Sequence, residues 1–125
     1  MILLNLPKIL VIESDPKAQK EIQDTFDGII EIIPAYSIRQ AYRLFLTHQD
    51  LHSIVVNICV PGFCVPGFRP NTQRLIKKMR NTFRGIIVSV SSLSLYRLIP
   101  NTSVGSDYRC SKTKVVGRIL ELLER

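Results

Sequence analysis

Two hydrophobic patterns alternate along the sequence, and this alternation limits the folds open to the chain. Solid apolar runs, short enough for single buried strands, occupy residues 9–12, 29–33, 53–58 and 86–90, with a weaker run at 107–110. Between these runs the apolar residues recur every three or four positions, as they do on one face of a helix. Strands that are apolar throughout need cover on both faces, which indicates parallel strands joined by helical crossovers.

The helical segments carry their own start signals. Asp15 and Pro16 supply an N-cap followed by a proline in the first turn, and Ser37 with Gln40 forms a capping box. Further helices are expected over residues 71–83, 92–99 and 113–125. The pattern predicts an α/β, flavodoxin-like (βα)5 fold, with a doubly wound five-stranded parallel sheet of order 2-1-3-4-5 in a three-layer αβα sandwich.

Composition places the chain among globular proteins without disulfides or zinc. No linker or change of composition divides it, so we expect a single domain over residues 1–125. The cysteines are three in number and lack metal-ligand spacing (Cys59, Cys64 and Cys110). No apolar run is long enough for a signal sequence or a membrane span, and we expect a cytoplasmic protein without a membrane partner.

Polar residues follow several of the predicted strands. In open α/β sheets, functional sites form beyond the carboxyl ends of the strands. The polar residues expected at this edge are Glu13, Ser14, Asp15, Asn57, Ser91 and Lys112.

The order and spacing of these residues resemble the receiver domain of bacterial response regulators, over essentially the whole chain. "KILVIESDP" resembles the first strand and acidic cluster of that family, and "VVNICVPG" its third strand and loop. "IIVSVSS" resembles the fourth strand, and "VGSDYRCSK" the approach to the family's lysine. The resemblance implies a signalling module of two-component, phosphorelay type, with a phosphoacceptor aspartate, a magnesium ion, a hydroxyl residue and a lysine in its pocket.

The sequence departs from the family pattern where phosphoryl transfer would take place. The phosphoacceptor position falls on Asn57, whose amide lacks the carboxylate oxygen that forms an acyl phosphate. The acidic pair falls on Glu13 and Ser14, which leaves one carboxylate, while Asp15 suits a helix cap. Neither Mg²⁺ nor another cofactor is therefore expected.

The remaining pocket residues predict a pseudo-receiver held in one state. The charges of Glu13 and Lys112 roughly cancel. If the two side chains meet, hydrogen bonds from Asn57 and Ser91 would complete a polar plug that needs no metal.

The segment after the third strand repeats the sequence CVPGF, at residues 59–63 and 64–68. The first copy supplies a Pro-Gly turn, and the second delays the next helix to about residue 71. Phe63 and Phe68 either belong to a duplication tolerated at the surface or form a docking loop, since exposed phenylalanines are costly without a partner.

Positive charge is concentrated in the middle of the chain. The net charge is +7, and residues 51–106 contain no acidic residue. Arg74, Lys77 and Lys78 share one helical face, which is either a solvated face or an attraction for an acidic protein or nucleic acid. The chain lacks a helix-turn-helix, a zinc module and an RNP-type motif, which counts against nucleic acid.

We do not expect an enzyme. The candidate nucleophiles are Ser91, Ser92 and Cys59. His52 precedes the third strand and Ser91 follows the fourth, so the length of a parallel strand, about 17–20 Å, separates base and nucleophile.

Together these features predict a receiver-like module that acts through protein–protein interaction without phosphorylation. The expected partner is a histidine kinase, an output protein or another signalling protein with acidic character, and a homodimer stays open. Two alternatives also stay open: unorthodox phosphorylation, for example at Ser14 or Ser91, and a basic nucleic-acid-associated domain.

Overall fold

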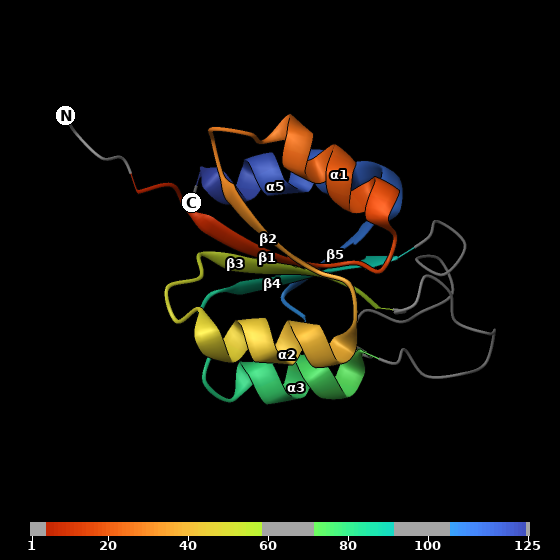
Figure 1. Ribbon diagram of the computed structural model, residues 1–125. Coiled ribbons are helices and arrows are strands. Elements are labelled where there is room, and N and C mark those ends of the chain that lie inside the picture. Colours follow the sequence, from red (N-terminus) through yellow and green to blue (C-terminus); the bar gives the residue numbers. More distant parts are fainter. Residues whose placement is uncertain (1–4, 59–71, 92–105, 125) are drawn as a thin grey trace.

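The computed structural model describes residues 5–58, 72–91 and 106–124. Its sheet contains β1 (Lys8–Ile12), β2 (Glu31–Ala35), β3 (Ser53–Asn57), β4 (Ile86–Ser91) and β5 (Tyr108–Ser111). The strands are all parallel and lie in the order β2-β1-β3-β4-β5 (Figure 1). This confirms the flavodoxin-like topology predicted from the alternating patterns.

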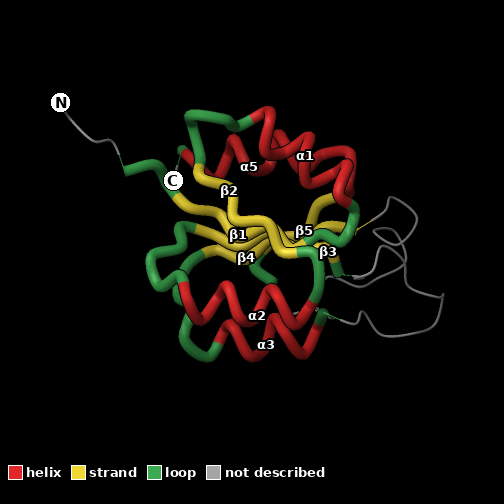
Figure 2. The backbone as a smooth tube through the Cα atoms, viewed as in Figure 1, coloured by secondary structure: helices red, strands yellow, loops and turns green. Residues whose placement is uncertain are grey.

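Helices cover both faces of the sheet. One face carries α1 (Pro16–Thr25) and α5 (Val115–Leu123), and the other carries α2 (Ile38–Thr47) and α3 (Gln73–Arg80), as Figures 1 and 2 show. A short 3₁₀ helix, η1 (Lys112–Lys114), leads from β5 into α5. The helix expected at residues 92–99 lies outside the described residues. In the described ranges, no helix has the length and apolar character needed to cross a bilayer.

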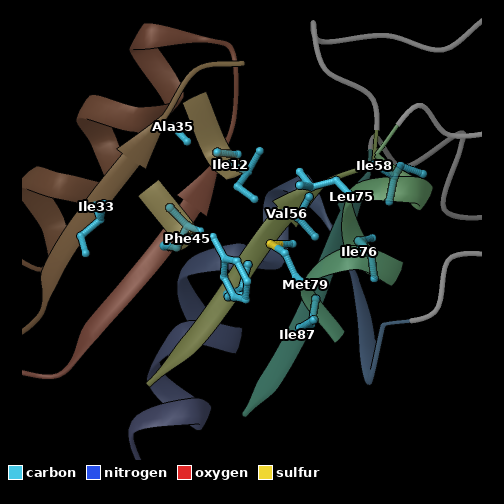
Figure 3. Close-up of a cluster of buried hydrophobic side chains, with 13 residues drawn as sticks. Ile12, Ile33, Ala35, Phe45, Val56, Ile58, Leu75, Ile76, Met79 and Ile87 are labelled. Atoms are coloured by element: carbon cyan, nitrogen blue, oxygen red, sulfur yellow. The ribbon is translucent and has the colours of Figure 1, made fainter. Parts of the chain in front are cut away.

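Successive residues of each strand supply the two cores in turn. In β1, Ile9 and Val11 pack under α1 and α5, whereas Leu10 and Ile12 pack toward α2 and α3. Figure 3 shows the second cluster, in which side chains from the strands meet Phe45 of α2 and the apolar side chains of α3. A sheet buried on both faces in this way explains why its strands read as solid apolar runs.

The second strand begins two residues later than the sequence predicts, at Glu31 instead of residue 29. The amides of Ile29 and Ile30 both donate to the carbonyl of Phe26, at 2.9 and 3.0 Å, and Gly28 adopts a φ of +79°. Ile29 therefore belongs to the turn that closes α1, and it is 53% exposed. β-Branched character alone could not reveal that this turn takes up the first residues of the run.

The third helix is shorter than the predicted range 71–83, and ends at Arg80. Phe83 lies beyond it and packs edge-on against Phe45, with ring centroids 6.2 Å apart. The guanidinium of Arg80 donates to the carbonyls of Phe83 and Gly85 and pairs with Asp107. These contacts turn the chain from the end of α3 back into β4.

Candidate functional site

The carboxyl ends of β1 and β3 bring two polar residues together. Ile12 and Val56 are neighbours in the parallel register, so the residues that follow them, Glu13 and Asn57, are adjacent at this edge of the sheet. The amide of Glu13 donates to the carbonyl of Ala35 at 2.9 Å, which continues the backbone pairing toward β2. Both side chains are buried, with exposed fractions of 4% for Glu13 and 7% for Asn57.

The carboxylate of Glu13 is the centre of this group. Asn57 Nδ2 donates to Glu13 Oε1 at 3.0 Å, and Lys112 Nζ lies 3.3 Å from the same oxygen. The other oxygen, Oε2, accepts from the backbone amide of Asp15 at 3.0 Å. Lys112 reaches the carboxylate from η1 with its side chain 42% exposed. One negative charge is thus buried with one ammonium and two N–H donors around it.

The start of α1 uses the remaining carboxylate of the acidic cluster. Asp15 Oδ1 accepts from the amide of Lys17 at 3.0 Å, and Pro16 is the first helical residue. This confirms the predicted N-cap, which satisfies one of the free amides at the helix start. Ser14, between the two carboxylates, is half-buried.

Gln19 is a residue of this region that the sequence reading missed. Its side chain is fully buried, and Nε2 lies 2.8 Å from the carbonyl of Val11 and 3.1 Å from those of Glu13 and Ala35. One amide group of α1 therefore holds the ends of β1 and β2 together and fixes the backbone that presents Glu13. The available signal was a glutamine three positions before Ile22, on the buried side of the helix.

The hydroxyl residue of the predicted pocket lies at the carboxyl end of β4, as the sequence predicts. Ser91 is buried at the end of β4, where its neighbour in β5 is Ser111. The β4 residue in register with Asn57 is Val90. His52 precedes β3 at the amino end of the sheet, so Ser91 and His52 lie at opposite ends, as the sequence predicts.

The sequence also predicted a basic face on the third helix and a docking loop after the third strand. Arg74, Lys77 and Lys78 are exposed on α3. The candidate docking loop with Phe63 and Phe68 lies outside the described residues.

The donor groups around Glu13 do not fit a magnesium ion. Mg²⁺ requires near-octahedral oxygen coordination, but both carboxylate oxygens of Glu13 already accept hydrogen bonds or face an ammonium. Asp15 is directed to the helix amide, and Asn57 presents its NH₂ group to Glu13. Within the ranges that the structure describes, no group of three or more His, Cys, Asp or Glu side chains could hold a metal.

A cavity of about 390 Å³ adjoins the Glu13 group. Its walls are mainly apolar side chains from α1, α5 and the strands beneath, including Ile22, Val55 and Val115. Glu13, Asn57 and Lys112 form part of the lining. The site is thus a charge-balanced polar group beside an apolar space, and it offers no nucleophilic carboxylate at position 57.

Solved receiver domains match the fold over almost their full length. A two-component response regulator from Clostridium difficile has a TM-score of 0.71 at 20% identity, covering 95% of this chain and 97% of that chain. A response regulator receiver domain protein from Clostridium thermocellum has a TM-score of 0.69 at 16% identity, covering 96% of both. A chain from the complex of the phosphorylated P1 domain of CheA3 with CheY6 from R. sphaeroides has a TM-score of 0.64 at 11% identity, covering 94% and 95%. No protein-family model and no curated protein matches the sequence. The chain thus has the receiver-domain fold.

Proposed function

We propose that this chain is a receiver-type signalling module that works without phosphorylation, through contact with a protein partner. The observation that carries the proposal is the hydrogen bond from Asn57 to Glu13. An amide at the phosphoacceptor position has no carboxylate oxygen with which to form an acyl phosphate. The amide also donates to the carboxylate beside it, a contact that an aspartate at this position could not make while ionised.

The charge balance of the pocket supports this proposal. A pocket with several carboxylates requires a bound cation, whereas here a single buried carboxylate is paired with Lys112 at 3.3 Å. Without Lys112, the buried carboxylate of Glu13 would have no compensating charge beside it. Lys112 thus balances the Glu13 carboxylate from the edge of the pocket, which supports a pocket that needs neither phosphate nor Mg²⁺.

A protein partner is the proposed output of the module. CheY6 has been solved in complex with the phosphorylated P1 domain of CheA3, and that complex is among the structures that share this fold. We infer a histidine kinase or an output protein as the partner class, in the cytoplasm, with no catalytic activity of the chain itself.

Intact-mass spectrometry tests the proposal directly. The purified chain is incubated with acetyl phosphate and Mg²⁺, next to a receiver domain that carries the usual aspartate as positive control. We expect no adduct of about 80 Da, the mass of one phosphoryl group, on this chain. A stable adduct would overturn the proposal, and its loss in Ser14→Ala or Ser91→Ala would assign the unorthodox acceptor.

A further inference from the structure

The two helical layers of the domain differ in charge. α2 and α3 lie side by side on one face of the sheet (Figures 1 and 2) and contain six basic residues and no acidic one. α1 and α5, on the other face, contain three basic and three acidic residues. The net charge of +7 is therefore not spread over the surface, because the α2/α3 layer alone carries +6.

Most of these cations are exposed and free of internal carboxylates. Arg80 is the exception, because it pairs with Asp107. The other five are exposed and make no salt bridge to a described carboxylate; we call them the basic face: Arg39, Arg43, Arg74, Lys77 and Lys78. Spacings of three and four residues place them in a row on each helix. Two neighbouring rows of unpaired cations attract a polyanion.

One contact joins the two helices, between a lysine of α3 and an aromatic ring of α2. Lys78 Nζ of α3 lies 4.8 Å from the ring centroid of Tyr42 in α2. This cation–π contact keeps the ammonium at the surface between the helices. It also covers a face of the aromatic ring that a nucleobase would use for stacking.

A hollow with both polar and apolar lining lies at the carboxyl ends of the same helices. Its volume is about 400 Å³, and its lining combines the apolar side chains of Phe45, Leu46 and Phe83 with the polar ones of His48, Gln49 and Thr82. Leu46 is 56% exposed and lies one turn after Arg43 on the same helix. The two phenylalanine rings and the exposed leucine offer an apolar side chain of a partner a place to pack, and the polar residues of the lining can bond to the backbone of the partner.

We propose that the basic face and this hollow form the docking surface for an acidic protein segment that carries an apolar anchor residue. The inference rests on the proposed function, because it gives the protein partner its chemistry and its place on the domain. Carboxylates of the segment lie along the rows of cations, and the anchor enters the hollow beside Leu46. A nucleic acid would use the cations but would leave the hollow empty and find the Tyr42 ring covered.

Fluorescence anisotropy of the full chain tests the proposal with defined probes. The first probe is a short fluorescein-labelled peptide of glutamate and leucine, the second replaces each leucine by glutamine, and the third is a single-stranded oligodeoxynucleotide of the same length. At about 50 mM salt, where the Debye length is near 14 Å, we expect the leucine-containing peptide to bind most tightly. Tighter binding of the oligonucleotide, or no binding of the peptide, would overturn the proposal.

Matched variants separate the docking surface from the overall charge. The double variant R74E/K77E should weaken peptide binding by about tenfold or more. The control K17E/K20E makes the same change in net charge on α1, and should change the affinity by less than about twofold. Equal losses in the two double variants would show that only the net charge matters, and would overturn the assignment.

A third variant examines the hollow. Leu46→Gln keeps a good helix former at an exposed position, so the fold should not change. We expect it to weaken binding of the leucine-containing peptide and to leave the glutamine-substituted peptide unaffected. An unchanged affinity for both peptides would remove the anchor from the proposal. These results are independent of the phosphorylation assay, since a phosphoryl adduct would overturn the proposed function without altering the binding data.

Discussion

Replacing Asn57 by aspartate tests whether the pocket is built around a single negative charge. Asn57 Nδ2 lies 3.0 Å from Glu13 Oε1, so the variant places a second carboxylate oxygen within hydrogen-bond distance of the first. At an effective dielectric constant of about 20, two unit charges ~3 Å apart repel by about 5 kcal/mol. The ammonium of Lys112, 3.3 Å from Glu13 Oε1, offsets part of this repulsion. We expect the free energy of unfolding to fall by about 3 kcal/mol at a pH near 8.

The loss should depend on pH with a defined sign. In the unfolded chain the introduced carboxyl group has a pKa of about 3.9, and a loss of about 3 kcal/mol corresponds to a folded-state pKa raised by about two units. Because the folded protein then favours the protonated form, stability is lost as the pH rises from about 4 to about 6 and stays low above this window. Relative to the unsubstituted chain, about half of the loss should be present at a pH near 5.

Urea denaturation near pH 5 and pH 8 measures this effect. Asn57→Ala is the matched control, because it removes the amide without adding a charge, and its loss should be the same at both pH values. Millimolar Mg²⁺ should stabilise only the aspartate variant, which regains a second carboxylate. A variant with full stability at both pH values, or with a loss that does not change with pH, would refute the charge-balanced pocket.

Three further substitutions test contacts that hold the fold together. Gln19→Leu removes a buried donor shared by three carbonyl groups and should lower the free energy of unfolding by about 2–3 kcal/mol in urea; a loss below ~0.5 kcal/mol would contradict this role. Arg80→Ala removes the pair with Asp107, whose side chain is 43% exposed, and the hydrogen bonds to the carbonyls of Phe83 and Gly85. It should cost about 2 kcal/mol by the same assay, and a loss below ~0.5 kcal/mol would contradict the contribution of these contacts. Burial raises the pKa of the Cys110 thiol to about 11. Alkylation of Cys110 by iodoacetamide, followed by peptide mass spectrometry, should therefore stay slow until the pH approaches that value. Rapid modification of Cys110 near pH 8 would contradict this shift. The same shift predicts that stability falls between about pH 9 and pH 11, where the unfolded thiol is ionised and the folded one is not, and that Cys110→Val removes this fall.

The fold was predictable because its signals are local. A parallel strand covered on both faces is mostly apolar along its length, and the helix starts at Asp15 and Ser37 carry side chains that accept from backbone amides at 3.0 and 3.1 Å. The errors lie at the ends of elements, at Ile29 and Phe83. There the strand or helix gives way to a turn whose hydrogen bonds depend on neighbouring segments.

The site was predictable only in part. The meeting of Glu13 and Asn57 follows from the parallel order of the strands, since their carboxyl ends share one edge. The role of Gln19 was not visible, because its three acceptors lie in β1, in the residue that follows β1, and in β2, and these segments become neighbours only in the folded sheet. The place of Ser91 likewise depends on the register between β3 and β4.

Sequence by itself determined the architecture, the amide at position 57 and the absence of acidic residues from two helices. Tertiary structure decided that Lys112 reaches Glu13, and that α2, which carries Arg39 and Arg43, packs beside α3 with its cations. The physical reason is the range of the interactions. Periodicity and capping act between residues a few positions apart, whereas the pairing of charges depends on which elements the crossovers of the chain place side by side.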